Sequence, residues 1–243
     1  MRVWDIHPGY LSRQSLLGQH AEIHAVYSVL CGCRKGYSRH PETMRWKNHL
    51  ELLVDRHDLT VKEMVLRGFN HFSKIQKKKN NTEIKKIKIL SYVDKPARQF
   101  ELLREKYLRK GQSGRIPLPK NSSSFWAHHK YSIMGRGYRY YQEIQGFLKT
   151  REDYPIEKDN ELIEKVFYYM AKSPTEKSLK NVMDHLWGYF KNVCSEEERR
   201  TFRALKQEKP DRQLDYLFSL AQTYNQDYLL QSTIFADFLF LPF

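Results

Sequence analysis

The chain lacks several features that would assign it to a particular class of protein. No apolar run approaches the roughly 18 residues of a membrane span, and the first residues lack the apolar core of a signal peptide. Three cysteines, Cys31, Cys33 and Cys194, cannot form an even disulfide framework, which agrees with a reducing compartment. Neither a strand-like alternation of useful length nor an internal repeat is present. We therefore expect a cytoplasmic, mainly helical protein without a membrane partner.

Positive charge is abundant, and it is unevenly distributed. The net charge is +14. Residues 1–120 hold 25 Lys and Arg against 11 Asp and Glu, whereas residues 121–243 hold 17 of each. A polyanion-binding domain joined to an ordinary domain produces such an asymmetry. A basic domain without a polyanion partner is the alternative interpretation.

Helical spacing of apolar residues dominates the chain, and 40% of all residues are hydrophobic, as in a globular protein. In the first half the spacing predicts helices over about residues 10–30, 41–68 and 95–110. The third helix begins at an Asp94 cap and ends at Gly111. Six further helical stretches follow in the second half.

The stretch "GQSGRIPLPKNSSS" crowds glycine, proline and serine together and is the best candidate for a linker. It divides the chain into residues 1–118 and residues 121–243. The sequence therefore predicts an all-α protein with two helical domains. In the second domain we expect Ser195 to cap one of the helices.

Glu22 is the candidate catalytic carboxylate of the first predicted helix. Three of its four neighbours at helical spacing are small: Ser15, Gly18, Ala25 and Val29. A carboxylate among small residues lies in a shallow groove that a ligand can approach. We expect His20 and His24 to lie on either side and to supply proton donors or phosphate contacts. A solvated glutamate without a role is the alternative.

Two long stretches resemble the pyrimidine-dimer DNA glycosylases, the phage endonuclease V family. They are "MRVWDIHPGYLSRQSLLGQHAEIHAVYSVL" and "NHLELLVDRHDLTVKEMVLRGFN", within residues 1–71. The shared positions are Arg2, Gln14, Leu16, Glu22 and the run Arg67-Gly68-Phe69-Asn70. In addition, "YVDKPARQFELLREKYL" resembles a helix of cellular relatives.

The resemblance implies that the nucleophile is an α-amino group at the start of the chain. Here Met1 would supply it, because Arg2 is too bulky for the usual removal of the initiator methionine. An α-amine has a pKa of about 7.7–8.0, so a useful fraction is neutral and nucleophilic near pH 7. The amine would attack C1′ of the deoxyribose and form a Schiff base, and β-elimination would then cut the strand. Glu22 would stabilise the cationic sugar and move protons. No cofactor is expected.

The partner implied by the resemblance is damaged double-stranded DNA, bound by a monomer. Ser15, Ala21 and Ala25 stand where phage members carry a histidine and two arginines. These departures bear on dimer specificity and on affinity. The candidate DNA-binding residues are Arg2, Arg13, His20, His24, Arg39, Lys47, Arg67, Lys77, Lys78 and Lys79.

No metal site is expected from the sequence. The stretch "CGC" lacks the spacing of zinc-binding cysteine pairs, and only two cysteines lie in this half of the chain. His57 falls on the apolar stripe of the predicted helix over residues 41–68, and we expect a core histidine whose hydrogen bonds are satisfied.

The second half resembles the YbgA-type domain of unknown function over about residues 122–238. The matching blocks are "FWAHHKYSIM", "NVMDHLWGYF" followed by "SEEER", and "YLLQSTIF". A candidate polar pocket comprises His129, Lys130, Tyr131, His185, Tyr189 and Lys191. Helix packing by the aromatic residues is the alternative interpretation.

The leading hypothesis is a DNA repair glycosylase with abasic-site (AP) lyase and strand-cleaving activity, fused to a helical accessory domain. Two alternatives stay open. One is a nucleic-acid-binding protein without catalysis, favoured by Ala21 and Ala25. In the other, the C-terminal domain acts on modified nucleotides and the basic half serves as a nucleic-acid tether.

Overall fold

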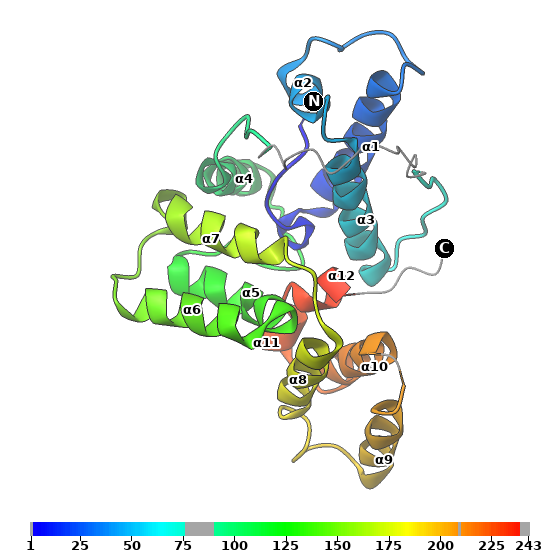
Figure 1. The fold of residues 1–243 in the computed structure, drawn as a ribbon, viewed down its shortest axis with the longest axis vertical. Coiled ribbons are helices and arrows are strands. Elements are labelled where there is room, and N and C mark those ends of the chain that lie inside the picture. Colours follow the sequence, from blue (N-terminus) through cyan, green and yellow to red (C-terminus); the bar gives the residue numbers. More distant parts are fainter. Residues whose placement is uncertain (1, 76–89, 209, 239–243) are drawn as a thin grey trace. The chain divides into compact units, whose positions relative to one another are not determined.

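The computed structural model describes residues 2–75, 90–208 and 210–238 (Figure 1). It divides into two compact units, residues 1–112 and 113–243, which are described separately. Within the described residues every regular element is helical, and β-type pairing is limited to isolated bridges such as that between Asn121 and Pro155. The predicted all-α class is therefore confirmed. None of the described helices is both long and apolar enough to cross a bilayer.

The first unit is built on two long helices that pack against each other (Figure 1). Its elements are η1 (Pro8–Tyr10), α1 (Arg13–Leu30), α2 (Pro41–Trp46), α3 (Leu50–Leu66) and α4 (Pro96–Lys110). One part of the core joins the N-terminal segment to these helices through Val3, Ile23 and Trp46. Burial of this apolar surface is what holds α1 and α3 together.

Two local predictions in the first unit were wrong. The predicted helix over residues 41–68 is two helices, because α2 ends at Trp46 and the His49 N–H closes a short turn onto the Trp46 carbonyl. Asp94 does not cap α4; Lys95 occupies the cap position without a side-chain bond. The Asp94 carboxylate pairs instead with Arg2.

The second unit contains the remaining helices. They are α5 (Ser122–Arg136), α6 (Tyr138–Lys149), η2 (Ile156–Lys158), α7 (Asn160–Met170), α8 (Glu176–Trp187), α9 (Glu196–Leu205), α10 (Pro210–Thr223), α11 (Asp227–Leu230) and α12 (Ile234–Phe238). Helix α5 packs against α6, α7 and α8 and forms the centre of this unit. As predicted, Ser195 caps α9, in a reciprocal capping box with Glu198.

Candidate functional site

The N-terminal segment is irregular in backbone, yet it lies inside the first unit. Val3 and Ile6 are buried. A buried irregular backbone must find partners for its polar groups outside a helix or a sheet. Arginine side chains supply many of them. Arg45 donates to the Val3 carbonyl, and Arg56 donates to the carbonyls of Asp5 and Ile6.

Arg67 extends this arrangement to the following residues. Its guanidinium donates to the carbonyls of Pro8, Gly9 and Leu11. Its Nε also donates to the fully buried Glu63 at 2.7 Å. Because these donors are engaged with the protein itself, the geometry gives Arg67 a structural task. Its predicted role as a DNA contact is not tested by this arrangement.

The start of the chain is anchored next to Glu22. The Trp4 N–H donates to Gln19 Oε1 at 2.9 Å, and Gln19 Nε2 donates to Thr60 Oγ1 at 2.8 Å. Gln19 precedes Glu22 by three residues and so lies on the adjoining surface of α1. Two residues, Arg2 and Val3, separate Trp4 from Met1, which itself lies outside the described residues.

The face of α1 that carries Glu22 is open beside the carboxylate. Glu22 is half-buried. A Cβ added to Gly18, one turn earlier, would meet no neighbouring atom within 4 Å. Two turns earlier, the buried Ser15 hydroxyl accepts a hydrogen bond from Lys106 Nζ of α4 at 2.8 Å. Burial, with Lys110 adding to it, lowers the pKa of the Lys106 amine.

The sequence analysis did not single out Lys106. Lys106 places a positive charge beside Ser15, the position at which the phage sequences carry a histidine. No spacing rule links position 106 to position 15, because α4 reaches α1 only through the tertiary fold. The resemblance of the α4 sequence to a helix of cellular relatives was the one available signal.

Three of the predicted DNA-binding residues are exposed, and a fourth, Arg2, forms an ion pair. Arg13, Arg39 and Lys47 are exposed, and the Arg13 guanidinium lies over the Phe69 ring. Arg2 pairs with Asp94 at 2.5 Å and lies over the Trp4 ring. The predicted contacts Lys77, Lys78 and Lys79 lie outside the described residues.

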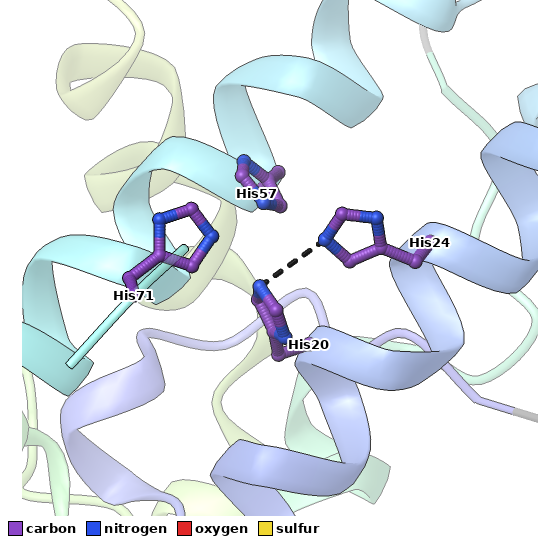
Figure 2. Close-up of side chains that lie close together, drawn as sticks. All are labelled: His20, His24, His57 and His71. Atoms are coloured by element: carbon purple, nitrogen blue, oxygen red, sulfur yellow. Dashed lines mark hydrogen bonds between the residues drawn. The ribbon is translucent and has the colours of Figure 1, made fainter. Parts of the chain in front are cut away.

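His20 and His24 do not flank Glu22, contrary to the expectation. Two residues along an α-helix correspond to a rotation of roughly 160° to the other side. Both rings instead face His57 of α3 and His71, which follows α3 (Figure 2). Figure 2 shows the four rings directed toward a common centre. One ligand atom from each ring lies within 4.8 Å of those of the other three.

Three of the four histidines have a lowered pKa. Burial, together with the repulsion of the other three histidines, lowers the pKa of His20 to about 4. Burial also lowers the pKa of His24 and of His71. Each neutral ring offers one nitrogen lone pair.

His57 was expected to be a core histidine with satisfied hydrogen bonds, and this was wrong in part. The residue is buried, with 1% of its surface exposed. Its Nδ1 lies 3.2 Å from Asp58 Oδ1. Its Nε2, however, is buried without a hydrogen-bond partner, and so is Nε2 of His71. Such buried unpaired nitrogens are rare and need an explanation.

The six candidate residues of the second unit do not gather in one pocket. Tyr131 and Tyr189 share a hydrogen bond of 2.7 Å between their hydroxyls, and Lys130 Nζ lies over the rings of Tyr131 and Tyr228. Burial, and then the bond to Tyr189, raises the pKa of Tyr131. His129 is buried and its ring bonds to the Phe125 carbonyl.

The other two candidates lie apart from this tyrosine group. His185 is exposed and stacks parallel to Tyr138. Lys191 lines a pocket of about 580 Å³ between α8 and α9. Four of the residues that line this pocket are cationic: Lys191, Arg199, Arg203 and Lys206. Trp187, Asn192 and Phe202 complete the lining.

Comparison with known families identifies a different family in each half of the chain. A search of curated proteins and a search of solved structures gave no match. Residues 1–77 match the family model described as pyrimidine dimer DNA glycosylase, and residues 130–238 match that of a protein family of unknown function, DUF1722. Both resemblances seen in the sequence are confirmed. The N-terminal part of the chain is therefore similar to the pyrimidine dimer DNA glycosylases, and residues 130–238 are similar to the DUF1722 family.

Proposed function

We propose that the first unit is a DNA glycosylase with AP lyase activity that uses the α-amino group of Met1 as its nucleophile. The observation that carries the proposal is the anchoring of Trp4 to Gln19, beside Glu22, within a segment matched to the glycosylase family. Three residues of extended chain span about 10 Å. We propose that this short length of chain, held at Val3 and Trp4, keeps the α-amine of Met1 in the surroundings of Glu22.

The proposed reaction begins with the neutral amine. Its lone pair forms a bond to C1′ of the deoxyribose, and the bond between C1′ and the base breaks. The base leaves with that electron pair and takes up a proton. The nitrogen loses a proton and forms a double bond to C1′ as the C1′–O4′ bond breaks; O4′ takes up a proton, and a protonated Schiff base results. Loss of a C2′ proton breaks the C3′–O bond by β-elimination and cuts the strand.

Glu22 is the proposed stabiliser of the cationic sugar and the carrier of protons during these steps. The open surface at Gly18 supports this role, because a bulky neighbour there would hinder the approach of a sugar. The target nucleotide would be flipped out of the duplex, at a cost of a few kcal/mol. Exposed Arg13, Arg39 and Lys47 are proposed to contact phosphates.

Borohydride trapping on duplex DNA with an abasic site tests the proposal. Borohydride reduces a Schiff base to a stable amine, so an active chain becomes covalently attached to DNA. We expect an adduct that maps to the peptide containing Met1. Acetylation of the α-amine should abolish it, whereas a C-terminal tag should leave the yield unchanged. Absence of an adduct with the unmodified chain would contradict the proposed chemistry.

Lys106 provides a specific control for this experiment, because its amine also has a lowered pKa. If the acetylated chain still forms an adduct, the modified peptide identifies the amine responsible. Lys106→Arg keeps the positive charge and removes the primary amine. We expect this variant to be trapped as efficiently as the unmodified chain. An adduct on Lys106 would reassign the nucleophile.

Binding without catalysis is the second candidate function. Ala21 and Ala25, which stand where phage members carry arginines, favour it. It predicts salt-dependent DNA binding with no covalent adduct. A third candidate places the activity in the second unit, with the first unit as a tether. The cationic pocket at Lys191 favours this candidate, and a fall in nucleotide affinity in Lys191→Ala would support it.

A further inference from the structure

Four histidines from three segments of the first unit converge, and the proposed DNA chemistry uses none of them as a group. His20 and His24 lie one turn apart on α1. His57 comes from the middle of α3, and His71 comes from the segment after it. Ring centroids of neighbouring members lie 4.6–5.2 Å apart (Figure 2).

One hydrogen-bonded pair of ring nitrogens already has the separation found around a tetrahedral metal ion, and the others lie near it. Zinc binds histidine nitrogen at about 2.0–2.1 Å, so two nitrogens on one tetrahedral ion lie about 3.3 Å apart. His20 Nε2 and His24 Nε2 lie 3.2 Å apart. All four ligand atoms lie within 4.8 Å of one another. The widest pair is therefore at most about 1.5 Å farther apart than two ligands of an ideal tetrahedral ion. Small rotations of the rings can remove this difference.

The hydrogen bonding leaves lone pairs directed at the centre. His57 Nδ1 faces the Asp58 carboxylate, an arrangement in which Nδ1 donates its proton and Nε2 keeps its lone pair. Nε2 of His57 and Nε2 of His71 are buried without a partner. A bound cation would satisfy both atoms. In metal sites, a ligating histidine commonly donates its other ring N–H to a carboxylate in the same way.

The protonation state of the cluster agrees with metal binding. Metal ions bind the neutral imidazole, and four close imidazoles disfavour protonation of one another. The lowered pKa values of His20, His24 and His71 follow from burial and from this mutual repulsion. Simple packing of aromatic rings would not require the nitrogens to converge or to lack partners.

We propose that His20, His24, His57 and His71 bind one divalent transition-metal ion, with zinc as the preferred ion. Imidazole ligands suit zinc, copper and nickel, whereas magnesium and calcium prefer oxygen. Four protein ligands complete a tetrahedral shell, which is typical of a structural site rather than a catalytic one. The ion would tie α1 to α3 and to the chain that leaves α3.

The proposed metal lies on the side of α1 away from Glu22. It would fix the orientation of α1, and therefore the position of the Glu22 face, without taking part in a reaction. The proposal does not depend on glycosylase activity. A chain that binds the metal and forms no adduct with DNA would contradict the proposed function alone.

Metal content and cobalt spectroscopy test the proposal on the full chain, produced without a polyhistidine tag. We expect about one zinc per chain by elemental analysis. After the metal is removed with a chelator, added Co²⁺ should give the intense visible absorption of tetrahedral coordination. One equivalent of Zn²⁺ should displace it. Zinc should also raise the thermal unfolding midpoint, because it binds only the folded state.

His71→Ala is the most informative variant, because His71 lies outside the helices and its loss leaves their hydrogen bonds intact. We expect zinc affinity to fall by a factor on the order of 100 or more. Loss of a residue that only hydrogen-bonds to a metal ligand already lowers metal affinity about 10–100-fold. His57→Gln should have a similar effect. His49→Ala, a half-buried histidine of the same unit without a capping bond, is the matched control.

Three outcomes would overturn the proposal. The first is a chain that neither retains zinc nor gives the tetrahedral cobalt spectrum. The second is an equal loss of affinity in His49→Ala and His71→Ala. The third is a thermal midpoint that zinc raises equally in the unmodified chain and in His71→Ala. Circular dichroism of each variant establishes that it is folded.

Discussion

The Trp4 N–H donates a hydrogen bond to Gln19 Oε1 at 2.9 Å inside the first unit. The amide of Gln19 also donates to Thr60, so one side chain links the N-terminal segment, α1 and α3. Both bonds are buried. Gln19 is therefore the side chain that ties the first residues directly to the helix that carries Glu22.

Replacing that amide tests the link. We expect Gln19→Leu to lose about 2 kcal/mol of stability, because two hydrogen bonds of about 1 kcal/mol each disappear while the volume is nearly kept. We also expect borohydride trapping to slow by at least about tenfold, since a misplaced reactive group costs 10–100-fold. Urea unfolding and trapping kinetics measure the two effects. Gln222→Leu, at an exposed position of α10, should change neither.

The role of Glu22 is tested by a change of charge alone. Glu22→Gln keeps the side-chain volume, and we expect the rate of strand cleavage to fall by about 100-fold or more, the usual contribution of a proton-transferring group. Thermal stability should stay the same. Glu51→Gln, an exposed glutamate of α3, is the matched control. Cleavage within a few-fold of the unmodified chain would show that Glu22 is an ordinary surface residue.

The Arg67–Glu63 pair predicts a large effect on folding. Glu63 is fully buried, and Arg67 Nε donates to it at 2.7 Å. Arg67→Ala would remove a charged hydrogen-bond donor from this buried carboxylate, so we expect a loss of about 3–5 kcal/mol in urea unfolding. The double variant Arg67→Ala with Glu63→Gln should recover part of the loss. Destabilisation below about 1 kcal/mol would contradict this assignment.

DNA binding should respond to salt through the first unit. Each lost phosphate contact reduces the slope of log affinity against log salt by about 0.9. Replacing Arg13, Arg39 and Lys47 with alanine should therefore reduce the slope by about 2.7. Replacement of three exposed cations of the second unit is the control: Lys149, Lys177 and Arg200. Equal effects of the two triple variants would contradict the predicted location of the DNA-binding surface.

Local patterns in the sequence predicted most of the helices. The spacing of apolar residues indicated α1, α4 and α5 to α10, whereas the short η2, α11 and α12 were not predicted. Gly111 ends α4 in a left-handed conformation, as expected. The break between α2 and α3 was missed because apolar spacing continues across it. The turn at His49 depends on how Trp46 packs into the core, which periodicity does not reveal.

The surroundings of the candidate site were harder to predict, because they join residues far apart in sequence. Lys106 meets Ser15 across 91 positions, and Arg67 meets Pro8 across 59. The spacing of His20 and His24 was visible, and two histidines four residues apart can share a metal ion. Without knowledge that α3 brings His57 beside them, a phosphate contact was the simpler interpretation.

The same long separations determine the order in which the first unit can assemble during synthesis. Asp5 bonds to Gln99, and Ser12 bonds to Tyr107 of α4. At 5–20 residues per second, a ribosome needs about 5–20 s to add the 94 residues between Asp5 and Gln99. The bonds of the N-terminal segment to α4 can therefore form only after its bonds to Gln19, Arg45 and Arg67 have become possible. The 77 residues that match the glycosylase family end before those partners begin, so that stretch alone cannot complete the unit.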